Sequence, residues 1–561
     1  MIIRKNRGGI ILKQILIKSF YVLIALVMSV SVLAGCDRDP GQSSQSVVSA
    51  DEDPNKWEPF GRYEEQVVVN IGRNYEPAHN LPSPHTMEDN LLLDHIEERL
   101  NIKINYAWLA DANTYNDRVN MIITSGNLPD VMLVKSLTQF NQLVEAELLE
   151  DLSIPFERTI SPYLKGIFDS YGDRAFNTSK FGDALYAVPD LNPGYHFAIM
   201  WIRDDWLRRA NASAPTTLDE VEDLAKKFVD MKLGGANTVG LATNGWLYGF
   251  NNSFPTMDPV FHYYDAFPGK WYKDGSGEYV YGSVTQEAKT ALARITEMYK
   301  DGLIDTQFAV RASADVNALL TSGKCGMFFG PWWVPLWPIN DTLRNDPEAD
   351  WKPYLAPVNE DGEYQVYRQN PHVQYIVVRK GFEHPEAVMK IFNLEYAGIK
   401  KLDEEAGAIY KGLGVNWTTW PLPLQFDYDD MVVRQYEHYQ EALDNNNDTS
   451  NLDEFEKMMF ADIVANNEAP RADVNKWANA VSRYDGMKIA SDPRVKAIEN
   501  VFPKETDLMQ MKWDNMYKLE SETYLKIIMG EEPIDYFDQF VAQWKSLGGD
   551  EITAEVNGMF D

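Results

Sequence analysis

The sequence is poor in the residues that most often build catalytic and metal centres. It has two cysteines and eight histidines in 561 residues, and no Cys/His cluster with the spacing of a zinc site. It also lacks the motifs of serine hydrolases, P-loop nucleotidases, HExxH zinc proteases and dinucleotide-binding enzymes. We therefore predict a protein that is not an enzyme, with no cofactor and no metal.

Basic residues are also scarce relative to acidic ones. The chain has 52 Lys and Arg against 84 Asp and Glu, for a formal charge of −32. Nucleic acid and an anionic membrane surface both require a basic face, so we expect neither as a partner. With so many acids, chance pairs such as Asp204-Asp205 or Asp429-Asp430 do not indicate a glycosidase.

The N-terminus departs from this acidity. An apolar run from Phe20 to Val32 follows five basic residues, and it is too short to span a membrane but suits a signal-peptide core. It ends in Leu33-Ala34-Gly35-Cys36, which resembles the lipobox of bacterial lipoproteins. The resemblance implies that residues 1–35 are a signal peptide and that Cys36 is lipidated after cleavage, as by palmitate. The alternative is an uncleaved anchor with an incidental Cys36.

The polar residues that follow Cys36 predict a flexible tether. Residues 36–60 are rich in Ser, Gln and acids, which is typical of a flexible linker. We expect the folded body to be held at the cell membrane on its extracytoplasmic face. With Cys36 acylated, Cys325 has no partner, and its apolar neighbours favour a buried small hydrophobe.

Apolar periodicity predicts an α/β fold. Strands and helices alternate, and this pattern indicates a parallel sheet with right-handed crossovers. In such sheets ligands bind beyond the carboxyl ends of the strands. The expected strands are 67–71, 102–108, 131–134, 197–202, 239–242 and 373–378; the expected helices are 87–100, 115–124, 217–231, with a Thr217–Glu220 capping box, and 286–300. Beyond Asp429 we expect mainly helix.

The most unusual stretch is Gly323 to Pro338. A short strand (Met327 to Phe329) meets a Gly-Pro break, and three tryptophans follow among further prolines, so the chain must leave regular structure. Such rings could form an apolar wall with indole donors, suited to sugars, or a core plug. Neighbours in an extended loop point opposite ways. Of Trp332, Trp333 and Trp337, we predict that Trp332 stacks on the ligand, with Trp337 as a second wall.

The other candidate ligand-binding residues lie at strand exits and chain breaks. Arg203 offers a donor fork, but an ion pair with Asp204 or Asp205 is an equal alternative. His372 is more often structural in such a setting. For the loop residues, core packing and ligand contact remain equal alternatives. The remaining candidates are Asn244, Trp246, Trp271, Tyr272, Asn370, Tyr375 and Trp417.

Six segments together resemble the extracellular solute-binding lipoproteins of bacterial ABC importers, in the LplA-like branch that includes oligosaccharide binders. They are 125–130 (SGNLPD), 185–189 (LYAVP), 201–207 (WIRDDWL), 215–220 (PTTLDE), 299–305 (YKDGLID) and 323–327 (GKCGM). The resemblance implies a two-lobe periplasmic-binding-protein-like fold with hinge-crossing strands, a ligand cleft between the lobes and a helical C-terminal part. The expected lobes are 61–188 plus 370–412, and 189–369 plus 413–561.

The same resemblance implies a function. We expect a membrane-tethered monomer that captures a carbohydrate, such as an oligosaccharide, and delivers it to the permease of an ABC transporter. Residues 230–237 lack the carboxylates of the calcium loop found in some relatives, so we predict no calcium there. A lipid-anchored glycan hydrolase and a surface glycan-adhesion or sensing module remain alternatives.

Overall fold

The computed structural model describes residues 53–75, 81–111, 114–194, 196–249, 254–368, 370–400, 402–413, 417–498 and 506–559. Within these ranges no helix is both long and apolar enough to cross a membrane. The signal-peptide and Cys36 predictions lie outside the described residues.

The first sheet contains five strands in the order β2-β1-β3-β14-β6. β1 runs parallel to β2 and β3, as predicted, whereas β14 is antiparallel to both β3 and β6. Both faces are covered, since Val131 and Leu133 enter one apolar cluster and Met132 and Val134 enter another. This explains the unbroken apolar run of β3. The strands are β1 (Val67–Asn74), β2 (Ile102–Ala110), β3 (Val131–Val134), β6 (Val188–Pro189) and β14 (Tyr375–Val378).

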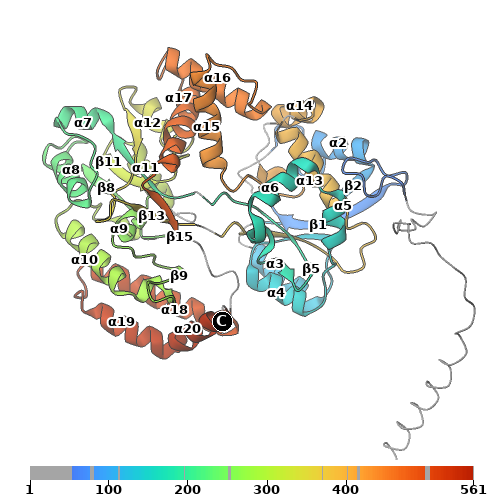
Figure 1. Ribbon diagram of the computed structural model, residues 1–561, viewed down its shortest axis with the longest axis horizontal. Coiled ribbons are helices and arrows are strands. Elements are labelled where there is room, and N and C mark those ends of the chain that lie inside the picture. Colours follow the sequence, from blue (N-terminus) through green and yellow to red (C-terminus); the bar gives the residue numbers. More distant parts are fainter. Residues whose placement is uncertain are drawn as a thin grey trace, which may run out of the picture. The chain divides into compact units, whose positions relative to one another are not determined.

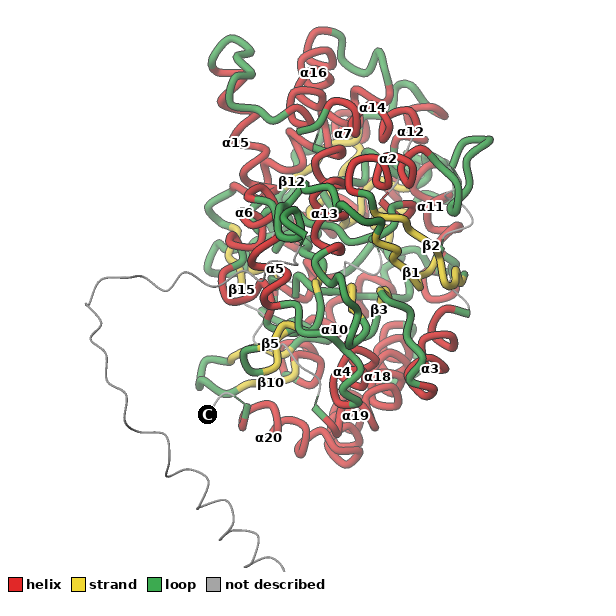
Figure 2. The backbone as a smooth tube through the Cα atoms, turned by 90° about the vertical axis from the view of Figure 1, so that its right-hand side faces the viewer, coloured by secondary structure: helices red, strands yellow, loops and turns green. Residues whose placement is uncertain are grey.

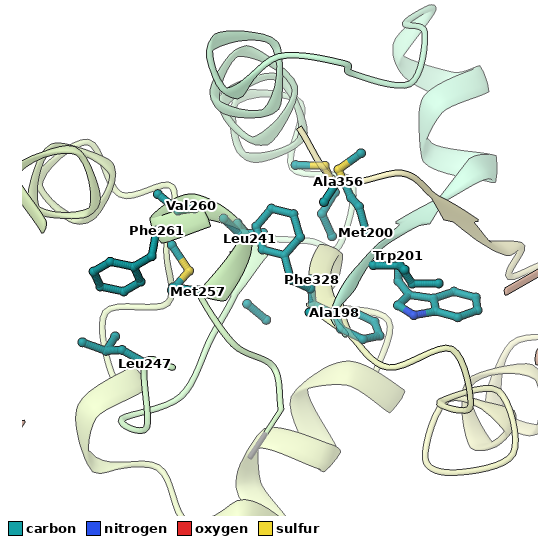
Figure 3. Close-up of a cluster of buried hydrophobic side chains, with 14 of the residues drawn as sticks. Ala198, Met200, Trp201, Leu241, Leu247, Met257, Val260, Phe261, Phe328 and Ala356 are labelled. Carbon is teal, nitrogen blue, oxygen red and sulfur yellow. The ribbon is translucent and has the colours of Figure 1, made fainter. Parts of the chain in front are cut away.

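The second sheet contains four strands in the order β12-β7-β11-β8. β8 and β11 are parallel, and β7 is antiparallel to both β11 and β12. The sheet has its own large core, part of which is seen in Figure 3, where Leu241 and Phe328 of the sheet lie near Met257 and Leu247. The strands are β7 (Ile199–Arg203), β8 (Val239–Ala242), β11 (Cys325–Gly330) and β12 (Trp351–Tyr354).

Helices pack around both sheets. Those around the first sheet include α13 and α14, which lie beside α2 despite their distance in the sequence (Figure 1). The helices of this part are α2 (Leu91–Leu100), α3 (Tyr115–Ser125), α4 (Leu137–Glu145), α5 (Ser153–Thr159), α6 (Pro162–Ser170), η1 (Gly172–Phe176), α13 (Ala387–Ile399), α14 (Glu404–Leu413) and η4 (Trp417–Thr419), with a small hairpin of β4 (Lys180–Phe181) and β5 (Ala184–Leu185).

The second sheet is accompanied by α7 to α12 and by two pairs of short strands. The predicted Thr217–Glu220 capping box is present at the start of α8. The helices are α7 (Asp204–Ala210), α8 (Leu218–Asp230), α9 (Asp258–Tyr263), η2 (Gly282–Val284), α10 (Gln286–Lys300), η3 (Phe308–Val310), α11 (Ser313–Thr321) and α12 (Asn340–Asn345). The strand pairs are β9 (Trp271–Lys273) with β10 (Tyr279–Tyr281), and β13 (Tyr364–Tyr367) with β15 (Val495–Ile498).

The C-terminal part is mainly helical, as predicted. α18 packs on α10 and α19, an arrangement that can be followed in Figure 2. The elements are α15 (Met431–Asp444), α16 (Glu454–Glu468), α17 (Val474–Ala480), the π-helix η5 (Val481–Gly486), η6 (Ile489–Ser491), α18 (Asp507–Ile528), α19 (Tyr536–Trp544), the π-helix η7 (Lys545–Gly549) and α20 (Asp550–Gly558).

In the described part of the chain, three segments connect the cores of the two sheets: 190–198 without residue 195, 368–374 without residue 369, and 427–430. Hydrogen bonds join them, from Asp190 N to the Gln374 carbonyl (3.0 Å) and from Gly194 N to the Asp429 carbonyl (3.1 Å). The Asp190 carboxylate also accepts from Val373 N at 2.8 Å. Residues 420–426 contribute Trp420, Leu422, Leu424 and Phe426 to a core of the first sheet, although the predicted boundary at 413 assigns them to the second lobe.

Candidate functional site

The carboxyl ends of β8 and β11 meet at one edge of the second sheet, which we call the strand-end edge. Because β7 is antiparallel to β11, its first residue, Ile199, pairs with the last residue of β11, Gly330. The loops that begin after β8 (from Thr243) and after β11 (from Pro331) therefore leave from the same edge at which segment 190–198 enters. This is where open α/β sheets bind ligands.

The loop after β11 holds its three tryptophans in different environments. The Trp201 indole anchors the loop by donating to the Pro331 carbonyl at 3.0 Å. Trp333 is half-buried with its ring edge-on to Phe254, at 5.2 Å between centroids. Trp337 also meets Phe254 edge-on but is 52% exposed. Trp337 is therefore the exposed ring of this loop.

Trp332, which we predicted to be the stacking residue, is only 7% exposed. The backbone of Trp332 lies close to Gly486. A Cβ atom added to Gly486 would be 3.0 Å from the Trp332 carbonyl oxygen. The Trp332 ring meets His196 edge-on at 6.0 Å. The close approach of η5 thus turns Trp332 inward, and its predicted stacking role remains a prediction.

The loop after β8 presents a second exposed ring. Asn244 is buried, and its side-chain oxygen accepts from Trp246 N at 2.7 Å, which fixes the turn. Trp246 is 59% exposed. Its ring is nearly parallel to that of Tyr517 on α18, with centroids 6.3 Å apart. Asn244 therefore holds the turn, while Trp246 supplies the open aromatic surface.

Trp271 and Tyr272 are both buried on β9. Trp271 packs against Tyr281 (5.4 Å) and Tyr272 packs against Phe267 (5.2 Å), measured between ring centroids. Both side chains thus pack in the core, and their predicted contact with ligand remains a prediction.

A buried carboxylate, Glu520, supports the loop after β8 from beneath. It accepts hydrogen bonds from the hydroxyls of Tyr248, Tyr281 (2.8 Å) and Ser283 (2.6 Å). Burial raises the pKa of Glu520, and the three hydroxyl donors oppose that shift only in part. Since Glu520 and Tyr517 both lie on α18, this helix positions the loop that carries Trp246.

The candidates near the first sheet form an internal network. The Thr178 hydroxyl is 2.6 Å from His372 Nδ1 and accepts from the Tyr375 hydroxyl at 3.0 Å. Asn370 accepts from His372 N at 3.3 Å. Burial lowers the pKa of His372 to about 3, so the ring is neutral at physiological pH. These residues hold segment 368–374 against the first sheet.

Arg203 lies at the opposite end of β7 from the strand-end edge. Its guanidinium donates to Asp205 at 2.7 Å and to Asp346 at 3.1 Å, and it lies over the Trp206 ring. This is the scaffold ion pair that the sequence left open as an alternative. Trp417 begins η4, and its side chain lies outside the described residues.

Cys325 is fully buried in β11, and burial raises the pKa of its thiol to about 12, so its interpretation as a small hydrophobe is confirmed. In the described ranges no group of His, Cys, Asp or Glu side chains could hold a metal ion. In the stretch where some relatives have a calcium loop, the Thr238 hydroxyl accepts from Gly234 N and donates to the Gly235 carbonyl.

The fold and its crossing segments define a two-lobe, periplasmic-binding-protein-like solute-binding protein. A solved structure with this fold is the ABC-transporter substrate-binding protein FusA of S. pneumoniae, an EF-hand mutant in complex with fructo-nystose. It is similar with a TM-score of 0.60 at 14% identity, covering 88% of this chain and 99% of that one.

The family profile described as bacterial extracellular solute-binding protein matches residues 91–394, and the chain belongs to this family. Among its relatives is the polygalacturonan/rhamnogalacturonan-binding protein YtcQ of Bacillus subtilis, 22% identical over 486 residues, which are 83% of this chain and 87% of YtcQ. Lipoprotein LipO of B. subtilis is 29% identical over 241 residues, 41% of this chain and 45% of LipO.

Proposed function

We propose that this protein captures a carbohydrate at the strand-end edge, between its two lobes, and delivers it to the permease of an ABC importer. The observation that carries the proposal is the pair of exposed tryptophans, Trp246 and Trp337, on loops that leave the same edge of the sheet. Flat apolar rings rimmed by polar groups suit the faces of sugars. YtcQ and FusA support a carbohydrate ligand by what their names say they bind.

The proposal places the lobe boundary at the crossing segments. The first lobe then comprises 61–189 and 375–426, with 420–426 added because their side chains join its core. The second lobe comprises 199–367 and 431–561. This keeps the predicted division in outline and moves its last boundary from 413 to about 427.

We also propose that the protein binds without catalysis. A retaining or inverting glycosidase needs two carboxyl groups flanking the scissile bond. The carboxylates of the crossing segments are already engaged: Asp190 accepts from Val373 N, Asp427 is 3.6 Å from Lys400, and Asp429 binds two arginines, Arg174 and Arg368. This engagement favours capture over the alternative of a glycan hydrolase. The other alternative, a surface adhesion or sensing module, differs from the proposed function in that it would bind the glycan without a permease partner.

Replacing Trp246 or Trp337 with alanine is expected to weaken carbohydrate binding by about 10- to 100-fold while changing stability little. Each ring is more than half exposed in the free protein, so most of its contact area would be made with the bound sugar. Binding by titration calorimetry and melting temperature should be compared. Phe60→Ala is the matched control and should bind like wild type, because this 46% exposed ring lies among first-lobe residues such as Tyr163 and Asn393. Unchanged affinity in both tryptophan variants would contradict the proposal.

Lipid anchoring at Cys36 completes the proposed arrangement, and similarity to lipoprotein LipO supports it. Cys36→Ser should leave a full-length precursor that takes up no labelled palmitate and is not retained at the membrane. Mass spectrometry of the N-terminus and membrane fractionation check this result. Cys325→Ser is the control and should be processed normally. A Cys36→Ser protein that matures like wild type would show that another residue is acylated.

A further inference from the structure

The π-helix η5 brings an arginine against the tryptophan loop. η5 spans Val481–Gly486 between α17 and η6, and both Arg483 and Gly486 on it contact Trp332. π-helical turns are rare, and they are found frequently at functional sites. Since Trp332 comes just after the carboxyl end of β11, Arg483 lies at the strand-end edge.

Arg483 is a half-buried cation with no acidic partner in the part of the chain that the structure describes. Its Cζ lies 5.7 Å from the Trp332 ring and 5.0 Å from the Phe455 ring. Its Nη1 donates to the Gln435 side-chain oxygen over a long 3.4 Å. Among the described residues no carboxylate forms an ion pair with it.

Two hydrogen-bond donors, one on Arg483 and one on Trp332, lack an acceptor; we call these two contacting side chains the patch. The Nε of Arg483 and the indole Nε1 of Trp332 are both buried, and neither has a hydrogen-bond partner within the described ranges. Other indole N–H groups of the described residues, such as those of Trp351 and Trp544, also lack a partner, so it is the contact between two unpaired donors that points to a missing acceptor. An anionic oxygen is the acceptor that a guanidinium fork binds best.

The neighbouring charges do not fill this role. Asp427 is near enough to favour the charged form of Arg483, as is Tyr439, but the larger effect is burial, which lowers the pKa of Arg483. The Asp427 carboxylate is 3.6 Å from the Lys400 ammonium. His196, on the other side of the Trp332 ring, is neutral because burial lowers its pKa to about 4.

Other arginines near the segments that connect the two sheets form ion pairs with carboxylates. Arg368 and Arg174 bind Asp429, and Arg434 binds Asp430 while lying over Tyr428. A chain with 84 acidic against 52 basic residues has no shortage of carboxylates for Arg483. Arg483 therefore differs from these three neighbouring arginines, each of which binds a carboxylate.

We propose that Arg483, with the Trp332 indole N–H, binds the carboxylate of an acidic sugar, so that the ligand is a uronate-containing glycan. This inference rests on the proposed function and names its substrate class. The guanidinium supplies the charge and a planar fork, and the two aromatic rings shield the ion pair from water. A neutral glycan would leave both donors without an acceptor and would bind less tightly.

Titration of the full chain with tetragalacturonate and with its methyl ester tests the proposal. The wild type should bind the acid at least about 30-fold more tightly than the ester, since charge-assisted hydrogen bonds are lost in the ester. Arg483→Met should lose this preference, binding both forms with the affinity of the ester. Arg483→Lys, which keeps the charge without the fork, should fall between them.

Arg158→Met is the matched control, because Arg158 also lies over a tryptophan, Trp57, at 4.1 Å, but on α5 of the first lobe. It should keep the wild-type preference. Equal binding of acid and ester by the wild type, or a preference that survives in Arg483→Met, would overturn the inference. If Arg483→Met does not fold, the comparison of acid and ester on wild type still tests the substrate class, and the reduced preference of Arg483→Lys still tests the role of Arg483. Failure of every acidic and neutral glycan to bind wild type would instead refute the proposed function.

Discussion

Lys390→Met is expected to lower the free energy of unfolding by about 3–5 kcal/mol, the cost of removing one member of a buried charged network. The Lys390 side chain is fully buried on α13, and its ammonium donates to the carbonyls of Asn55 (2.8 Å), Glu58 (2.6 Å) and Gly61 (2.9 Å). Methionine fills the space of the side chain but donates nothing. The buried Glu386 would also lose its favourable charge interaction with Lys390.

Urea unfolding at pH 7 measures this effect, since burial lowers the pKa of Lys390 to about 8 and the ammonium form still dominates there. Cleavage of residues 53–63 by a protease should also become faster, because these bonds hold the segment to α13. Lys165→Met, at a side chain that is 41% exposed, is the control and should change stability by less than about 1 kcal/mol. An unchanged urea midpoint for Lys390→Met would show that the three carbonyl bonds contribute nothing.

Glu520→Ala is expected to destabilise the second lobe by about 3–5 kcal/mol, because three buried hydroxyls lose their shared acceptor at about 1–3 kcal/mol each, with partial relaxation. The hydroxyls belong to Tyr248, Tyr281 and Ser283. The variant should also weaken carbohydrate binding, because Glu520 ties the loop that carries Trp246 to α18. Unfolding and binding titrations on one preparation separate the two effects.

Glu520→Gln is the matched variant that retains shape and removes the charge. Because burial raises the pKa of Glu520 above the ordinary 4.5, the folded state keeps a proton that the unfolded state loses as pH rises. Wild-type stability should therefore fall with rising pH from about 4.5 to the raised pKa of the folded state, and then level off, relative to Glu520→Gln. A difference between the two proteins that does not change with pH would contradict a raised pKa.

Local sequence patterns predicted most of the secondary structure near the site. The strands at 131–134 and 239–242 and the helix at 286–300 have the bounds expected from apolar periodicity. The capping box at Thr217 and the buried Cys325 were also predictable, because each depends on the residues immediately around it. The antiparallel pairing of β14 with β3 and β6 could not be predicted from local patterns, because it joins strands far apart in the sequence.

The environment of each candidate side chain depended on contacts that the sequence does not reveal. Trp332 is turned inward by Gly486 and covered by Arg483, both on a distant π-helix. Glu520 meets Tyr248 across 272 positions of the chain. No periodicity signals such pairs, because they depend on how α18 and η5 pack against the second sheet.

Calorimetric titration of the full chain with a panel of neutral and acidic oligosaccharides, followed by mass spectrometry of the recovered ligand, tests the central claim most directly. Our account predicts saturable binding of at least one oligosaccharide at micromolar or lower Kd, with the ligand recovered intact. It also predicts that the Trp246→Ala, Trp337→Ala double variant binds that ligand at least about 100-fold more weakly. No binding across the panel, or recovery of cleaved ligand, would contradict the account.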